Sequence, residues 1–412
     1  MSAYEIQDYV IDMGPMGPIG EGEALILRVN HNCPWNRCLF CHVYKGKKFS
    51  YRNVSEIKRD VDVIRKIVDL IENTSWDIGF QGRINREIIM ETARRFPQIY
   101  GIDAFHPTQE NVLALSTLNN VANWLLCGAK RVFLQDANAL IMSPAELVEV
   151  LSYIREIFPT VQTITSYARS KTCSRRSLKE LQALHEAGLS WVFVGIESGC
   201  DDILNHMQKG VKAGEHINGG KKIRAAGIDM AAFVMPGLAG SSAEMGKRHM
   251  LETIEVLNAV RPNEVRVRSL AVQENTPLYS KWEGGEFEPA AEDQMIDEIE
   301  MLIKGLEFDC IIETLQMTNT LFNIKGRLSE MRGDILSRIA DYKGLSPLER
   351  AGFRLKRYLY DGYLAFVEGW GKFDFGLSQL VKEAIEGLEK KSNDAPQKID
   401  RAIFVIKSKG VP

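Results

Sequence analysis

From about residue 121 onward, short apolar runs alternate with amphipathic stretches along the chain. The runs have the length of buried strands, and the stretches between them repeat apolar residues at the three- and four-residue intervals of helices. One earlier run precedes them, so strands are expected at residues 24–30, 131–138, 161–168, 191–199, 228–237 and 264–272. Strands that alternate with helices predict right-handed βαβ units and a parallel sheet.

Six such units predict an α/β fold, a partial (β/α)6 parallel barrel (TIM-like), with chemistry at the carboxyl ends of the strands. A flat doubly wound sheet is the alternative, because periodicity does not distinguish the two. No Gly-x-Gly-x-x-Gly opens a helix after the first strand, which weakens a dinucleotide-binding interpretation. The expected domains are a lead-in (1–23), the core barrel (24–285, with an insertion about 74–120 that holds a short strand and a helix near 86–96) and a helical C-terminal region (286–412).

Composition narrows the class of protein. The 412 residues are 45% hydrophobic and carry a net charge of -3, so no global basic field attracts nucleic acid or an anionic membrane. No run reaches the roughly 18 apolar residues that a membrane span needs. Seven cysteines, partly clustered and otherwise scattered, make a disulfide framework unexpected and a reducing, cytoplasmic setting the natural one. The scattered cysteines are expected to be small buried residues.

The cysteines that cluster follow the first expected strand, in the segment NCPWNRCLFCHVYK (32–45). Cys33, Cys38 and Cys41 lie on one loop, and crowded thiolates repel one another unless a metal or cluster neutralises them. Structural zinc needs four ligands, and His42 could complete a set. Adjacent residues rarely share one metal, however, and no second ligand pair follows. Three cysteines around a [4Fe–4S] cluster with one open iron also suit the pattern.

The chain resembles the radical S-adenosylmethionine (radical SAM) superfamily in this loop and in three later segments. Phe40 matches the aromatic residue that the family places before the last cysteine. The segments VGIESGCDDILNHMQKGV, RAAGIDMAAFVMPGLAG and VRVRSLAVQENTPLY are similar to the branch of elongator-type tRNA-modifying enzymes, methylthiotransferases and coproporphyrinogen dehydrogenases. The spacing Cys-x4-Cys-x2-Cys has one more residue in the first gap than the commonest family pattern, so the loop geometry is expected to differ locally.

The resemblance implies that Cys33, Cys38 and Cys41 bind a [4Fe–4S] cluster and that S-adenosyl-L-methionine (SAM) chelates the fourth iron. An electron from a flavodoxin- or ferredoxin-type donor would cleave SAM, and the 5′-deoxyadenosyl radical would abstract hydrogen from the substrate. Phe40 would lie against the adenine.

The resemblance also implies polar groups for SAM at the ends of later strands. Asp136 and Asn138 stand where the family often has Gly-Gly-Glu, and Glu197 ends the fourth strand. A helix cap or a buried ion pair is the structural alternative for Glu197. Gly237 and Gly240 could let the backbone approach the adenine, although a tight turn explains them equally well.

Arg266 and Arg268 are two residues apart on the last strand and therefore share one face. With the valines toward the helices, both guanidinium groups would point into the lumen and suit a carboxylate of SAM or substrate. A structural ion pair with Glu264 or Glu197 is the competing interpretation.

The expected function is thus a radical SAM enzyme, an oxidoreductase or transferase, that acts on an unidentified substrate, expected to be a small molecule. A radical SAM RNA-modifying enzyme is the alternative within enzymes, with nucleic acid not favoured as a partner. A non-catalytic zinc or iron–sulfur protein is the alternative outside them.

Overall fold

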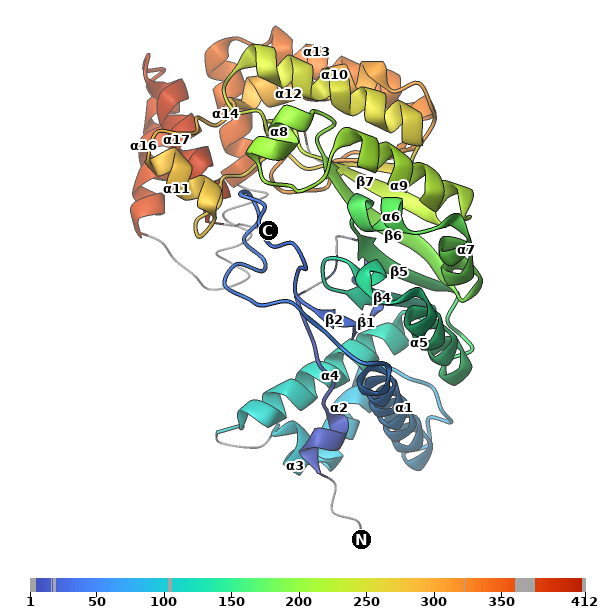
Figure 1. Ribbon diagram of the computed structural model, residues 1–412. Helices are drawn as coiled ribbons and strands as arrows, with labels where there is room; N and C mark the ends of the chain where they lie inside the picture. The colour runs from blue at the N-terminus through green and yellow to red at the C-terminus, as the bar shows by residue number, and fades with distance from the viewer. Residues whose placement is uncertain are drawn as a thin grey trace. The chain divides into compact units, whose positions relative to one another are not determined.

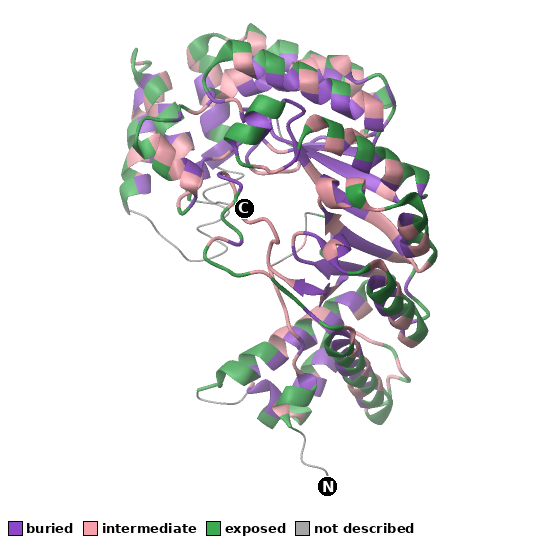
Figure 2. Ribbon diagram, in the orientation of Figure 1, coloured by how far each residue is buried: buried purple, intermediate pink, exposed green. Residues whose placement is uncertain are grey.

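The six expected strands are all present in the computed structural model, which describes residues 5–15, 17, 20–102, 106–321, 323–359 and 375–409. They are β1 (Leu25–Arg28), β4 (Arg131–Gln135), β5 (Thr163–Ala168), β6 (Leu189–Glu197), β7 (Asp229–Val234) and β8 (Glu264–Val267). Apolar side chains explain these strands: Leu27, Val132, Val194 and Val265 are among the least exposed residues. The six strands consist of buried and some half-buried positions, whereas the helices show buried and exposed positions in turn (Figure 2).

The order of the strands in the sheet is β1-β4-β5-β6-β7-β8-β9-β10, which follows the order of the chain. Register is parallel for β1 with β4, β4 with β5, β7 with β8 and β8 with β9. In a doubly wound sheet, the order of the strands across the sheet reverses at a switch point. The strand order found here has no such reversal. With its parallel strands in sequential order and its two free edges, the α/β fold is the predicted partial barrel.

The described chain has four further short strands that were not expected as separate elements, although Asn30 lies in the range 24–30 of the first expected strand. β9 (Ile311–Glu313) and the antiparallel β10 (Lys325–Arg327) extend the sheet from within the region expected to be helical. β2 (Asn30–His31) and β3 (Ser50–Tyr51) form a separate antiparallel pair on either side of the cysteine segment. Each has only two or three residues, too few for a periodic pattern to be recognised.

The helices of the described chain follow in sequence order, and Figure 1 labels most of them. They are α1 (Val54–Asp77), α2 (Arg86–Arg95), α3 (Pro97–Tyr100), α4 (Gln109–Leu126), α5 (Pro144–Ile157), α6 (Ser170–Arg175), α7 (Leu178–Glu186), α8 (Asp201–His206), α9 (Ala213–Ala225), α10 (Ala243–Val260), α11 (Pro277–Glu283), α12 (Glu292–Gly305), α13 (Leu328–Gly344), α14 (Pro347–Tyr358), α16 (Phe375–Glu389) and α17 (Ala395–Ser408), with short 3-10 turns at Ile6–Tyr9 and Ala139–Ile141.

In the segment expected to be an insertion, about 74–120, the described residues form helices joined by short turns and loops. α1 starts at a capping box, in which Asn53 accepts from the Glu56 backbone and Glu56 accepts from the Asn53 backbone. The helix continues to Asp77, where a short strand was expected, because Thr74 and Ser75 are buried and Thr74 Oγ1 donates to the Leu70 carbonyl. The expected helix near 86–96 is α2.

The chain divides into two compact units. The first unit consists of Met1–Pro34, Lys47–Phe193 and Lys222–Asp229, and the second of Trp35–Gly46, Val194–Lys221 and Met230–Pro412. In the second unit, α14, α16 and α17 share an apolar core that includes Leu355, Ala384 and Ile403. Of the aromatic-rich stretch 354–376, residues 360–374 lie outside the described chain. Across the described ranges, no helix is both long enough and apolar enough to cross a lipid bilayer.

Candidate cofactor site

The cysteine segment contributes to both units: Cys33 belongs to the first, and Cys38 and Cys41 belong to the second. None of the three thiols forms a disulfide; Cys38 is buried and the other two are half-buried. Leu39 anchors the second-unit part of the loop, because its N–H donates to the Met207 carbonyl at 3.1 Å and its carbonyl accepts from the Leu278 N–H at 3.0 Å. Its side chain lies in an apolar cluster, with Phe40 packed against it. The cysteines are therefore carried by a loop with fixed attachments.

The four residues between Cys33 and Cys38 are held by their own contacts. Trp35 Nε1 donates to the Gln208 carbonyl at 2.7 Å, and its indole packs where a Cβ on Gly210 would lie. Asn36 has φ of 44°, in the left-handed region, and its amide donates to the Tyr44 carbonyl. Asparagine tolerates that conformation better than most residues. The longer first gap thus follows a defined path.

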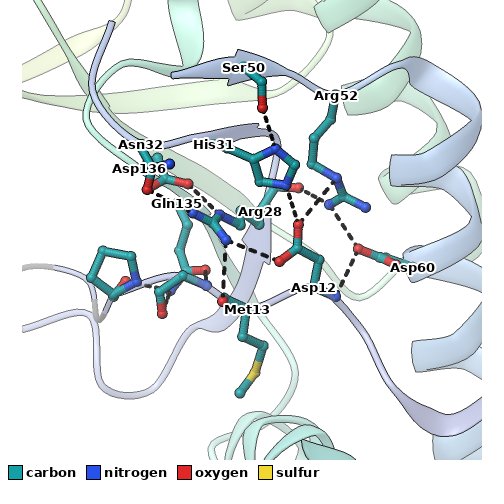
Figure 3. A network of polar contacts seen from close by, with 12 residues as sticks. Asp12, Met13, Arg28, His31, Asn32, Ser50, Arg52, Asp60, Gln135 and Asp136 are labelled. Atoms are coloured by element: carbon teal, nitrogen blue, oxygen red, sulfur yellow. Dashed lines mark hydrogen bonds and ion pairs between the residues drawn. The ribbon is translucent and has the colours of Figure 1, made fainter. Parts of the chain in front are cut away.

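In the first unit, Asp136 follows β4, and its carboxylate forms an ion pair through one oxygen only. Arg28 Nε donates to Asp136 Oδ2 at 2.6 Å, and the Asp136 side chain is fully buried (Figure 3). The other oxygen, Oδ1, is buried and has no hydrogen-bond partner among the described residues. The Asp136 backbone has φ of 71°, which is costly for a residue with a Cβ. A buried acceptor usually has a donor in a folded protein, so this oxygen has room for a hydrogen bond from a ligand, an ion or a water molecule.

Arg28 joins Asp136 to a wider network that the sequence pattern did not predict (Figure 3). Its guanidinium also donates to Asp12 Oδ1 at 3.1 Å, and His31 contacts the second oxygen of Asp12. Burial by itself lowers the pKa of Arg28, but Asp136 and Asp12 raise it above its ordinary value. A lone arginine inside the apolar run ALILRVN is the signal that could have revealed the network, because a buried charge needs a partner.

The first unit also shows what Asn138 does. Its Nδ2 donates to Thr172 Oγ1 at 2.9 Å, its Oδ1 accepts from the Arg169 N–H at 3.1 Å, and its carbonyl accepts from Asn30. These bonds join the end of β4 to the segment after β5 and account for the burial of Asn138. Its binding of SAM stays a prediction.

In the second unit, Glu197 at the end of β6 repeats the features of Asp136. Lys209 Nζ donates to Glu197 Oε1 at 3.1 Å, while Oε2 is buried without a described hydrogen-bond partner. Its φ is 63°. Lys209 also lies 5.7 Å from the centre of the Phe40 ring, a cation–π contact. The pair with Lys209 matches the buried ion pair weighed as the structural alternative, yet it leaves one carboxylate oxygen for a ligand. A Cβ on Gly195 would collide with this pair.

The glycines after β7 have packing reasons of their own. Gly237 has φ of 83°, its N–H donates to Glu298 Oε2 at 2.7 Å, and Met295 fills the space beside its Cα. Gly240 has φ of 75° and lies close to the Glu288 carbonyl. A tight turn therefore suffices to explain both glycines, and adenine binding at Gly237 stays a prediction.

The two arginines of the last predicted strand have different surroundings. Arg266 Nε donates to Glu264 at 2.8 Å and lies 3.6 Å from Glu313, so the structural ion pair is present. Arg268 is half-buried and forms no ion pair within the described ranges, and its charge, together with burial, lowers the pKa of His42. The charge of Arg266 is thus neutralised by glutamates, whereas the charge of Arg268, next to His42 of the cysteine segment, is not paired with a described carboxylate.

Glu298 and His249 form a buried titratable pair that leads to a pH prediction. Burial raises the pKa of Glu298 to about 7 and lowers the pKa of His249 to about 4. Between about pH 4.5 and 7 the folded state holds the Glu298 proton more tightly than the unfolded chain, so Glu298 makes stability fall as pH rises. His249 acts in the opposite direction between about pH 4 and 6.5, and the two effects offset each other where they overlap.

Glu298→Gln keeps an acceptor for the Gly237 N–H and removes the titration. We expect the variant, unlike the parent, to gain roughly 1–3 kcal/mol of unfolding free energy as pH rises from 4.5 to 6.5, because only His249 then titrates. Urea unfolding at several pH values measures this. Parallel pH profiles for the two proteins would contradict it.

Of the other four cysteines, Cys173, Cys200 and Cys310 are buried as expected, whereas Cys127 is exposed at the end of α4. Within the described ranges, no three His, Cys, Asp or Glu side chains gather as a site for a metal ion, so the structure does not bring Cys33, Cys38 and Cys41 together as a ready-made site. The donor chemistry of the cysteine segment, three thiols outside any disulfide, fits an iron–sulfur cluster.

Comparison with known proteins gives one family match. The family model described as the Radical SAM superfamily matches residues 27–251, more than half of the chain. A tRNA uridine(34) acetyltransferase of Methanocaldococcus infernus is 31% identical over 30% of this chain and 23% of its own. The protein of that name from Methanocaldococcus jannaschii is 22% identical over 68% of this chain and 48% of its own. The chain thus spans less than half the length of these two curated relatives.

Among solved structures, coproporphyrinogen III oxidase (HemN) from Escherichia coli is 12% identical, with 98% of this chain and 92% of that one covered, at a TM-score of 0.41. The predicted resemblance to the radical SAM superfamily is confirmed by the family model. The expectation that nucleic acid is not favoured as a partner finds no support, because the two curated relatives are named for tRNA.

Proposed function

The chain belongs to the radical SAM superfamily, and from this premise we propose that Cys33, Cys38 and Cys41 bind its cluster. Enzymes of the superfamily use a [4Fe–4S] cluster and SAM and generally need a reductant, and this chain is such an enzyme. Held by these cysteines and reduced, a [4Fe–4S] cluster would supply one-electron cleavage of SAM, which yields methionine and a hydrogen-abstracting 5′-deoxyadenosyl radical. Three thiols on one anchored loop are the observation that carries the assignment. A flavodoxin or ferredoxin is the proposed electron donor.

The work of the protein is then to bind and orient SAM. Asp136 Oδ1 is proposed to accept from the methionyl ammonium group, since it is a buried acceptor that lacks a donor. Glu197 Oε2 is proposed to accept from a ribose hydroxyl or the methionyl end, with Lys209 fixing the carboxylate. Arg268 is proposed to contact a carboxylate of SAM or substrate.

The proposed substrate is an RNA, rather than the small molecule expected from the sequence. The names of the two curated relatives support this choice, and each relative shares less than half of its length with the chain. Anaerobic reconstitution with iron and sulfide, followed by reduction with SAM present, tests the reaction. Release of 5′-deoxyadenosine, increased when RNA is added, is the expected result. A protein that binds zinc tightly and never cleaves SAM would overturn the assignment, and release that only small molecules increase would overturn the RNA substrate.

A further inference from the structure

The segment Arg169–Lys179 is a strongly basic stretch in a chain of net charge -3. Its eleven residues contain no aspartate or glutamate and five basic residues: Arg169, Lys171, Arg175, Arg176 and Lys179. Exposed side chains of one charge sign attract a partner of opposite charge, and two of the five, Arg175 and Lys179, are exposed. The site described above does not use it.

The fold places this basic segment at the chemically active end of the strands. β5 ends at Ala168 and runs parallel to β4, which ends at Gln135, so the basic segment and Asp136 both follow carboxyl ends of neighbouring strands in the first unit. Asn138 links them directly, through its bonds to Thr172 Oγ1 and the Arg169 N–H. A partner on the basic segment therefore lies beside the strand end that carries the proposed SAM contact.

The segment is held in place by its own interactions. Cys173 is fully buried within α6. The Arg176 guanidinium donates to the Leu140 carbonyl at 2.9 Å and the Met142 carbonyl at 2.7 Å. Lys222 Nζ donates to the Ser174 and Arg176 carbonyls at 2.7 and 2.8 Å. Arg176 and Lys222 are therefore occupied by hydrogen bonds to backbone carbonyls, and these bonds hold the backbone of the segment as a platform for its other side chains.

Arg175 and Lys179 are the charges that this platform presents. Both are exposed, and neither forms an ion pair with any residue that the structure describes. Glu180, the nearest acid in sequence, is engaged by the Ser177 N–H at 2.7 Å and lies 3.8 Å from Arg176. The positive charge of the two exposed side chains is therefore uncompensated.

We propose that the basic segment binds the phosphate backbone of an RNA substrate and holds the RNA at the carboxyl ends of β4 and β5. This rests on the proposed function, of which it names a binding surface. Lysine and arginine bound to phosphates supply most sequence-independent affinity for nucleic acid. An acidic protein is the less suitable occupant, because protein interfaces rely on apolar and aromatic anchors and the segment exposes Leu178 as its one large apolar side chain.

The test compares two charge-reversal variants of the full chain. Arg175→Glu with Lys179→Glu changes the basic segment, and Arg59→Glu with Lys66→Glu makes the same change of charge on the exposed side of α1. Binding of unfractionated tRNA is measured by fluorescence anisotropy at several salt concentrations, with circular dichroism and thermal unfolding as checks of folding. We expect the first variant to bind tRNA at least tenfold more weakly and to lower the slope of log affinity against log salt by about 1–2. The α1 variant should stay within about threefold of the parent.

The outcomes separate this inference from the proposed function. Parent protein that binds no tRNA would overturn the RNA substrate and, with it, this surface. Parent protein that binds tRNA as tightly as the first variant, with the same salt slope, would overturn the surface alone. An equal loss in both variants would also overturn it, since the effect would be one of net charge. Poly-glutamate that competes with tRNA at equal phosphate and carboxylate concentrations would assign the segment to acidic partners instead.

Discussion

Replacement of Cys38 by alanine is expected to leave the reconstituted protein without its iron–sulfur absorbance and without release of 5′-deoxyadenosine above background. A [4Fe–4S] cluster is held by cysteine thiolates, and two thiols in place of three leave a second iron without a protein ligand. Cys38 is also the most buried of the three, so solvent water has little access to replace its thiolate as a ligand. Bound iron and sulfide per chain, measured after gel filtration, and chromatography of the SAM products report the two losses separately.

Cys127→Ala is the matched control, because Cys127 is exposed at the end of α4 and lies outside the cysteine segment. This variant should keep both iron and SAM cleavage. Full iron content and full cleavage in the Cys38→Ala protein would show that the cluster is held elsewhere.

The second large effect is expected from Asp136→Asn, which should weaken SAM binding roughly ten- to a hundredfold while iron content stays that of the parent. An asparagine keeps the size of the side chain but loses the charge-assisted hydrogen bond, which is worth about 1.5–3 kcal/mol. Arg28 keeps Asp12 as a partner at 3.1 Å, so the substitution does not leave a buried cation alone. Equilibrium dialysis of SAM against reconstituted protein measures the affinity.

Asp12→Asn serves as the control for the ion pair, since Asp12 is partly exposed and contacts Arg28 from the other side. We expect it to lower stability more than SAM affinity. An Asp136→Asn protein with normal SAM affinity and a lowered unfolding midpoint would assign Asp136 a structural role only.

How far the sequence predicts this molecule depends on how local each feature is. The six core strands and the helical character of most of the C-terminal region follow from periodicity, because these elements bury apolar residues at regular intervals. The sequential strand order does not follow from periodicity, and β9 and β10 are too short to leave a pattern. Only the folded chain distinguishes the barrel from the doubly wound sheet.

At the site, the family resemblance implied Asp136 and Glu197 at the ends of strands, but their partners depend on tertiary structure. Lys209 reaches Glu197 only because α8 and the turn after it bring the chain back. Arg28 pairs with Asp136 across 108 positions of sequence. Asn138 was named for its position alone, and its hydrogen bonds to the segment after β5 could not be seen before the strands were paired.

Binding of SAM to the cluster itself is measured by electron paramagnetic resonance of the chemically reduced protein with and without SAM. We expect the signal of a reduced [4Fe–4S] cluster, about one per chain, with g-values that shift when SAM is added. The Cys127→Ala control should give the same signal and the same shift. A reduced protein with no cluster signal, or with a signal that SAM leaves unaltered, would contradict this binding.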